Sequence, residues 1–117
     1  MNDGQTNLGA GRQPKARILV ADDDRFYLQI FSDLIAGLGF ESITATNGHE
    51  AIEKVRSHKP DILIVDVVMP GIDGFEVTRR LKGDPATMHL PIVIVTSLSD
   101  RGSKLKGLQF GADELLN

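Results

Sequence analysis

Short runs of apolar residues recur along the chain, separated by longer stretches in which apolar residues are spaced as on one face of a helix. The runs lack the polar alternation of a half-exposed strand, and they cover residues 17–21, 42–46, 61–68 and 91–97, with Leu115 and Leu116 at the start of a fifth. Continuous apolar runs of this length are typical of strands buried on both faces of a parallel sheet. The pattern therefore predicts an α/β domain in which helices connect the strands.

The stretches between the runs carry start and stop signals of helices. Asn47 followed by Glu50 resembles a capping box at the start of a second helix, which Pro60 closes. Before it, Asp24 can cap a first helix that Gly39 ends. The apolar residues of this first helix recur at helical spacing, and they are Tyr27, Ile30, Phe31, Leu34, Ile35 and Leu38.

Two further helices complete the predicted fold. Asp73 and Glu76 repeat the cap signature before a third helix that contains Leu81, and residues 104–110 predict a fourth helix that ends at Gly111. Because crossovers between parallel strands are right-handed, this alternation predicts an open, doubly wound parallel sheet. At this chain length we expect five strands in the order 2-1-3-4-5.

Composition limits the classes of protein to consider. The chain has 117 residues, of which 41% are hydrophobic and 25% are charged, as is ordinary for one globular domain. It has no cysteine, which excludes disulfides, thiolate metal sites and cysteine nucleophiles. A net charge of -3 gives no electrostatic reason to expect direct binding of nucleic acid or of an anionic membrane. No apolar stretch reaches the ~20 residues of a membrane span, so we expect a cytoplasmic protein.

The two ends of the chain and its surface residues also carry predictions. Residues 1–15 are polar and rich in glycine, which predicts a disordered leader ahead of a folded domain over residues 16–117. The short basic cluster of Arg79, Arg80 and Lys82 predicts a solvated helix face. The three histidines are scattered over predicted helix ends and loops, and we expect them at the surface without a metal: His49, His58 and His89.

Acidic residues stand at the ends of predicted strands that would be neighbours in this sheet. Asp22 and Asp23 follow the first strand, Asp66 lies near the end of the third, and Thr96 lies near the end of the fourth. Sheets of this type bind ligands beyond the carboxyl ends of the strands, where the strand order reverses. Each residue alone also has a structural reading, as a loop acid, a hydrogen-bonded core acid or the entry to a helix. Their convergence on one edge favours a functional site.

The chemistry of this edge points to a metal ion. Like charges raise one another's pKa and destabilise the edge unless a cation neutralises them, and no Lys or Arg stands at these strand ends. Carboxylate oxygens without His or Cys are hard ligands, which favours Mg²⁺ held by Asp22 and Asp23. Asp66 is single and framed by apolar residues, so it is the candidate nucleophile toward phosphorus, and Thr96 can hydrogen-bond a phosphoryl oxygen.

Four segments carry these residues, and they read ILVADDD at 18–24, DILIVDVVMPGIDGFEV at 61–77, LPIVIVTS at 90–97 and GAD at 111–113. This set resembles the receiver domain of two-component response regulators, over nearly the whole chain from Arg17 onward. The resemblance implies a flavodoxin-like (βα)5 fold. It also implies that Asp66 accepts a phosphoryl group from the phosphohistidine of a sensor histidine kinase or of a phosphotransfer protein.

The resemblance implies further roles around Asp66. Asp22, Asp23 and the backbone carbonyl of Val68 would hold Mg²⁺ together with Asp66, and Thr96 would be the switch hydroxyl. Phosphorylation would then repack a surface that engages an output domain, a partner protein or a second copy in a homodimer.

The chain departs from the family pattern in two places. The family carries a Lys at the end of strand five and then helix five, and here the chain stops at Asn117, where that Lys would be the next residue. We therefore expect a C-terminally truncated piece of a longer protein, without the end of strand five and helix five. Leu115 stands where the family usually has an aromatic switch side chain.

Two other functions compete with a phosphoacceptor. One is a receiver-like adapter that binds partners without phosphorylation, which the missing Lys favours and the intact acidic set opposes. The other is a Mg²⁺-dependent phosphohydrolase, which usually needs an acid or base two residues after the nucleophile, where this chain has Val68. We expect a regulatory domain and not an enzyme, with chemistry limited to its own phosphorylation and dephosphorylation.

Overall fold

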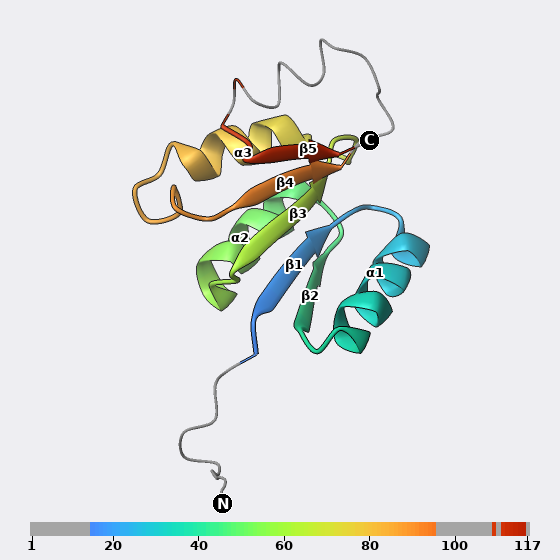
Figure 1. Cartoon of the computed structure of the whole chain (residues 1–117). Helices are drawn as coiled ribbons and strands as arrows, with labels where there is room; N and C mark the ends of the chain where they lie inside the picture. The colour runs from blue at the N-terminus through green and yellow to red at the C-terminus, as the bar shows by residue number, and fades with distance from the viewer. Residues whose placement is uncertain (1–14, 96–108, 110, 117) are drawn as a thin grey trace, which may run out of the picture.

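The structure is a computed structural model, and it describes residues 15–95, 109 and 111–116. Five parallel strands form one sheet in the order β2-β1-β3-β4-β5. The strands are β1 (Arg17–Ala21), β2 (Glu41–Ala45), β3 (Ile62–Asp66), β4 (Ile92–Val95) and β5 (Glu114–Leu116). The helices are α1 (Arg25–Gly37), α2 (Gly48–His58) and α3 (Gly74–Lys82). The predicted fold class and strand order are confirmed (Figure 1).

The three predicted helix caps are present. The Asp24 carboxylate accepts a hydrogen bond from the Phe26 amide at the start of α1 (2.9 Å). The side chains of Asn47 and Asp73 accept in the same way from amides three residues further on, at 2.8 and 2.9 Å. Each cap satisfies an amide that the first turn of a helix leaves without an intrahelical partner.

Two strands end earlier than predicted, and hydrogen bonds explain both differences. The second strand ends at Ala45, because the Thr46 amide donates to the Glu50 carboxylate (2.7 Å) and not to a neighbouring strand. The third strand ends at Asp66. Beyond it, the carbonyl of Val67 accepts from the first amide of α3 (2.9 Å), which draws the chain away from the ladder toward that helix.

Some predicted elements lie outside the described residues. The fourth strand is described as far as Val95, and Thr96 and Ser97 follow it outside that part of the chain. The helix predicted over 104–110 also lies outside it, apart from Gln109. Of the predicted leader, only residue 15 is described. These predictions therefore stay predictions.

Alternate side chains of each strand enter two separate packing layers. On one face of the sheet, Leu19, Leu63 and Ile92 are fully buried against α2 and α3. On the other face, Val20 packs with Leu28 and Ile35 of α1. Figure 1 shows α1 on one side of the sheet and the other two helices on the opposite side. This arrangement leaves the carboxyl ends of β1 and β3 open between the layers, which is where the acidic residues stand.

The apolar stripe of α1 is wider than the part of it that the sheet covers. Leu28 and Ile35 are buried, whereas Tyr27, Leu34 and Leu38 on the flank of the helix are more than half exposed. No helix of the part described here is long and apolar enough to cross a membrane. The predicted helix is present, but the predicted set of apolar residues contains only one of its two buried residues, Ile35, and leaves out the other, Leu28.

Candidate functional site

Three carboxylates meet at the carboxyl ends of two adjacent strands, β1 and β3. Asp22 and Asp23 directly follow β1, and Asp66 is the last residue of β3, which pairs with β1. One oxygen of each carboxylate lies within 4.8 Å of one oxygen of each of the others. The predicted convergence of these three residues is confirmed, and it follows from the pairing of two strands that are more than 40 residues apart in the chain.

The three consecutive aspartates have different local partners. Asp22 continues the β1 ladder, because its amide donates to the Ala45 carbonyl (3.0 Å). Its carboxylate accepts from the Asp24 amide (2.9 Å), which turns the chain sharply into α1. Asp24 uses its own carboxylate as the helix cap, whereas Asp23 is the exposed member of the cluster. Asp24 can therefore cap the helix while Asp22 and Asp23 remain available to the acidic cluster.

Gly74 allows the segment after Asp66 to pack tightly. The amide of Gly74 donates to the Val67 carbonyl, and a Cβ atom at position 74 would overlap the backbone carbonyl of Asp66. Thr78, one turn later, is fully buried and donates its hydroxyl to the Gly74 carbonyl (2.8 Å). The start of α3 is thus held against the backbone of the central acidic residue, and this fixes the position of Asp66.

Burial and neighbouring charge perturb the cluster. Burial, and then the charge of Asp22, raise the pKa of Asp66 from its ordinary value of 3.8 to about 6, and Asp23 adds to this rise. Backbone amides just after Asp66 act in the opposite direction. Burial also raises the pKa of Asp22, against the hydrogen bond from the Asp24 amide. The site therefore disfavours the ionised forms of Asp22 and Asp66, and a bound cation would relieve the repulsion between the carboxylates.

A cavity of about 490 Å³ opens beside the cluster, lined by Asp22, Asp23, Asp24, Tyr27, Phe31, Asp66, Val68 and Val95. Val68, whose carbonyl is the predicted fourth metal ligand, is thus at the rim of the same cavity. Val95 pairs with Asp66 across the β3 and β4 register. Thr96 is the next residue in the chain, and its side chain lies outside the described residues.

The donor set fits Mg²⁺. Its ligand atoms are carboxylate oxygens close together at a half-buried edge, and no histidine belongs to the cluster. Magnesium takes oxygen ligands in an octahedron, keeps several waters and is commonly bound by only one or two carboxylates.

The three histidines of the chain are exposed, in agreement with the prediction that they are surface residues.

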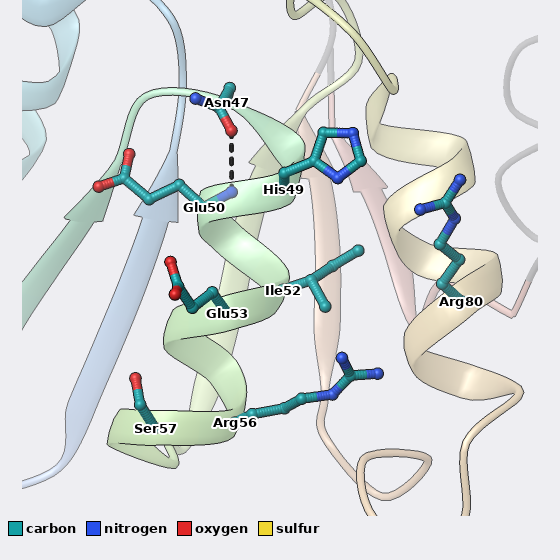
Figure 2. A pocket seen from close by; sticks show the side chains of 8 residues that line it. All are labelled: Asn47, His49, Glu50, Ile52, Glu53, Arg56, Ser57 and Arg80. Carbon is teal, nitrogen blue, oxygen red and sulfur yellow. Dashed lines mark hydrogen bonds between the residues drawn. The ribbon is translucent and has the colours of Figure 1, made fainter.

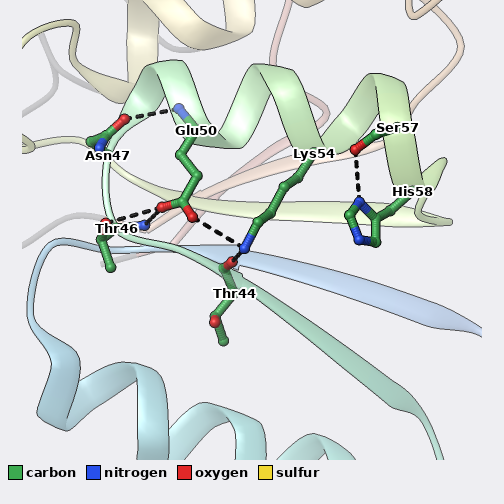
Figure 3. A network of polar contacts seen from close by, with 7 residues as sticks. All are labelled: Thr44, Thr46, Asn47, Glu50, Lys54, Ser57 and His58. Atoms are coloured by element: carbon green, nitrogen blue, oxygen red, sulfur yellow. Dashed lines mark hydrogen bonds and ion pairs between the residues drawn. The ribbon is translucent and has the colours of Figure 1, made fainter.

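Figure 3 shows a polar network around Glu50 that the sequence predicts only in part. The Asn47 side chain accepts from the Glu50 amide, as expected for a capping box. The Glu50 carboxylate, however, accepts from the amide and hydroxyl of Thr46, one residue before the usual partner, at 2.7 and 3.0 Å. It also pairs with Lys54 (3.1 Å), which donates to the Thr44 carbonyl (2.6 Å). The network therefore joins the start of α2 to the end of β2.

A second network joins α3 to the start of β5, and sequence reasoning missed it. The charge pattern predicts Lys82 on a solvated face, but its side chain is only 18% exposed. Its ammonium donates to the Leu90 carbonyl (2.7 Å) and to the Asp113 carboxylate (3.0 Å). The same Asp113 oxygen accepts from the Ile92 amide (2.7 Å). The GAD motif at 111–113 was the available signal, because it placed an acid just before the last strand.

Another cavity, of about 930 Å³, lies between α2 and α3 (Figure 2). Two arginines line it, one from each helix, and Ile52 lies between them. Arg56 pairs with Asp84 (3.3 Å) and Arg80 with Glu76 (2.7 Å), so both guanidinium groups already have a carboxylate. None of the three clustered aspartates lines this cavity. The acidic edge is therefore the stronger candidate for chemistry.

The fold and the acidic edge together define a doubly wound α/β domain. Its candidate cation site lies between β1 and β3, where the strand order reverses. The family model of the response regulator receiver domain matches residues 18–117. The chain therefore belongs to the receiver domain family of two-component response regulators. This family is regulatory, and its members interact with kinases and with output partners.

Relatives and solved structures agree with this assignment. Response regulator PleD of Caulobacter vibrioides is 42% identical over 101 residues, which cover 86% of this chain and 22% of PleD. Polar-differentiation response regulator DivK of Brucella anthropi is 33% identical over 104 residues, which cover 89% of this chain and 84% of DivK. The chain thus spans about a fifth of the length of PleD but most of DivK.

Among solved structures, the chemotaxis protein CheY4 of Vibrio cholerae superposes with a TM-score of 0.82 at 30% identity, over 87% of this chain and 85% of that one. The receiver domain of Francisella response regulator 1452 gives a TM-score of 0.80 at 28% identity, over 86% of this chain and 82% of that one. The flavodoxin-like fold expected from the sequence is confirmed by these similarities.

Proposed function

We propose that this chain is a phosphoacceptor that takes a phosphoryl group on Asp66 from a sensor histidine kinase or a phosphotransfer protein. The observation that carries the proposal is the meeting of three carboxylates, two of them with raised pKa values, at the carboxyl ends of paired strands. Such a cluster is costly without a ligand, and a domain that binds a cation and a phosphoryl group has a use for it.

The three aspartates have distinct proposed roles. Asp22, Asp23, Asp66 and the Val68 carbonyl would hold Mg²⁺. When bound, Mg²⁺ neutralises charge on the phosphoryl oxygens during transfer. Asp66 is the nucleophile, since it is central, half-buried and held in place by the close packing of Gly74. With a pKa of about 6, its carboxyl group is ionised at neutral pH and can attack phosphorus.

The switch is proposed on the residues that follow β4. Val95 pairs with Asp66, so the next residue in the chain, Thr96, is the candidate hydroxyl for a phosphoryl oxygen. Movement of this hydroxyl toward the phosphoryl group would couple the modification to the surface that an output domain, a partner protein or a second copy contacts.

We further propose that residues 16–117 form the receiver domain and that residues 1–15 are a leader.

The experiment is a labelling reaction followed by intact mass measurement. Protein, Mg²⁺ and a small phosphoryl donor are mixed, and we expect a gain of one phosphoryl group. Asp66→Asn should abolish the gain, and Asp23→Asn should weaken it. Asp33→Asn removes an exposed carboxylate of α1 and is the matched control that keeps the gain.

Two results would contradict the proposal. Equal labelling of the Asp66→Asn protein would show that the nucleophile is another residue. A folded protein that no donor labels would instead support the adapter function, in which the domain binds partners without being phosphorylated.

A further inference from the structure

The cavity of about 930 Å³ between α2 and α3 has no role in the proposed function, because none of the three clustered aspartates lines it. Three residues that line it stand in α2 at positions i, i+3 and i+7, and they are His49, Ile52 and Arg56. Residues at this spacing share one face of a helix. Figure 2 shows that this face of α2 is turned toward α3. Along the cavity, α2 therefore presents an imidazole, an apolar side chain and a guanidinium in a row.

The opposite wall adds a second guanidinium group. Arg80 of α3 also lines the cavity, and its side chain extends toward the end where His49 lies (Figure 2). The Arg80 side chain is 42% exposed and that of Arg56 is 55% exposed, so a ligand can reach both from solvent. The cavity is thus accessible and has nitrogen donors at both of its ends.

Both guanidinium groups keep donors for a further acceptor. Within the described part of the chain, Arg56 donates through one nitrogen to one oxygen of Asp84 (3.3 Å). Arg80 likewise donates through one nitrogen to one oxygen of Glu76 (2.7 Å). A guanidinium has five N–H donors in a planar fork, so each internal pair leaves room for a carboxylate of a second molecule.

The neighbouring acidic residues leave the cavity basic. Glu76 pairs with both Arg79 and Arg80, so one carboxylate faces two guanidinium groups. Glu50 and Glu53 line the cavity as well, but Figure 2 shows their carboxylates on the side of α2 away from α3. The whole chain has a net charge of -3, so this surface differs in sign from the domain that carries it. Such a surface attracts an acidic partner.

The length of the basic row selects the shape of that partner. His49 and Arg56 are seven residues apart, which is about 10 Å along a helix at 1.5 Å per residue. A single carboxylate cannot reach both ends of the row. Two acidic side chains that are two turns apart on another helix have the same spacing, and an apolar side chain between them would meet Ile52 at the centre.

We propose that the cavity between α2 and α3 binds an amphipathic helix of a partner protein, with acidic residues at positions i and i+7 and apolar residues at i+3 and i+4. One acidic residue pairs with Arg56, the other meets Arg80 and His49, and the apolar residues contact Ile52. Helices are commonly recognised in grooves through anchors at this spacing. This inference goes beyond the proposed function, since it requires no phosphoryl group and uses none of the clustered aspartates.

The test measures binding of a synthetic helical peptide that carries Glu at i and i+7 and Leu at i+3 and i+4. Fluorescence anisotropy of the labelled peptide at low ionic strength gives the dissociation constant. One control peptide has Gln in place of both Glu residues. A second control peptide keeps both Glu residues but moves them to the opposite face, at i+2 and i+5, so that its net charge is unchanged.

The protein variants are Arg56→Gln, Arg80→Gln and the matched control Arg79→Gln. Arg79 stands next to Arg80, pairs with the same Glu76 and is 56% exposed, but it does not line the cavity. All three changes remove one positive charge. Thermal unfolding of each variant shows that it is folded.

We expect the unaltered chain to bind the first peptide more tightly than either control peptide. Arg56→Gln and Arg80→Gln should each weaken binding about two- to fivefold, which is the upper range for one exposed ion pair, and Arg79→Gln should leave it unchanged. Added salt should weaken binding further. In NMR spectra, the amide signals that shift on binding should belong to α2 and α3.

Four outcomes would overturn the inference. An equal loss for Arg79→Gln and Arg80→Gln, or equal binding of the peptide with displaced Glu residues, would show attraction by net charge alone. Displacement of the peptide by inorganic phosphate would show a site for a small anion and not for a helix. Failure of the folded, unaltered chain to bind would exclude the proposed partner. No phosphoryl donor is present in these measurements, so their failure is distinct from a failure of the proposed phosphoacceptor function.

Discussion

Replacement of Asp66 by Asn should stabilise the metal-free protein, although Asp66 is the proposed centre of its function. The folded protein raises the pKa of this carboxyl group from 3.8 to about 6, mainly through burial. The folded state therefore binds a proton more tightly than the unfolded state, and the ionised group destabilises the fold. The destabilisation is absent below the unfolded pKa, develops as pH rises from 3.8 to about 6, and is complete at neutral pH.

The size of the effect follows from the shift. A difference of about two pKa units corresponds to about 3 kcal/mol at 1.36 kcal/mol per unit. Asp66 is only partly buried and faces an open cavity, so solvent screening reduces this figure, and we expect about 1 to 2 kcal/mol. Asn keeps the shape of the side chain and removes the charge. For a domain of this size, each 1 kcal/mol raises the melting temperature by about 4 to 8 °C.

The assay is thermal unfolding in a chelator, at pH 7.5 and at pH 4, for the unaltered chain, Asp66→Asn and the control Asp33→Asn. We expect Asp66→Asn to melt higher at pH 7.5 and the difference to shrink at pH 4, while the control follows the unaltered chain. An Asp66→Asn protein that is no more stable at pH 7.5, or a difference that does not change with pH, would refute the electrostatic account of the site.

Three further predictions test other parts of the structure. Mg²⁺ should raise the melting temperature of the unaltered chain more at pH 7.5 than at pH 5, because protons compete for Asp66 below its pKa of about 6, and it should raise that of Asp66→Asn less. In urea unfolding, Gly74→Ala should cost about 1 to 3 kcal/mol, since its Cβ would overlap the Asp66 carbonyl. Gly37→Ala, where a Cβ meets nothing within 4 Å, should be neutral or stabilising by up to about 1 kcal/mol. Asp113→Ala should cost about 1 to 3 kcal/mol in the same assay, because it leaves the half-buried Lys82 ammonium without its carboxylate.

The sequence predicts the strands and the helix caps because both depend on local patterns, and it predicts the strand order because alternating strands and helices in a chain of this length favour one doubly wound sheet. Apolar runs of strand length and the caps at Asp24, Asn47 and Asp73 lie within a few residues of the elements they define. The meeting of Asp22, Asp23 and Asp66 was also predictable, since residues at the ends of adjacent parallel strands share one edge.

What could not be predicted depends on contacts between distant parts of the chain. The Lys82 ammonium meets Asp113 across 31 residues, and charge pattern alone does not distinguish this lysine from a solvated one. The helical spacing of α1 likewise does not show that Leu28 contacts the sheet while Tyr27 faces the cavity. The orientation of each helix relative to the sheet decides which partner Lys82 meets and which side chains of α1 contact the sheet. This orientation is a property of the whole fold.

The central claim is tested most directly by locating the phosphoryl group. Protein labelled by phosphoramidate in Mg²⁺ is reduced with borohydride, which converts an aspartyl phosphate to homoserine, and fragment masses then place the altered residue. The account predicts homoserine at position 66 alone, and only where Mg²⁺ was present during labelling. Homoserine at position 22 or 23, or equal labelling in a chelator, would contradict it.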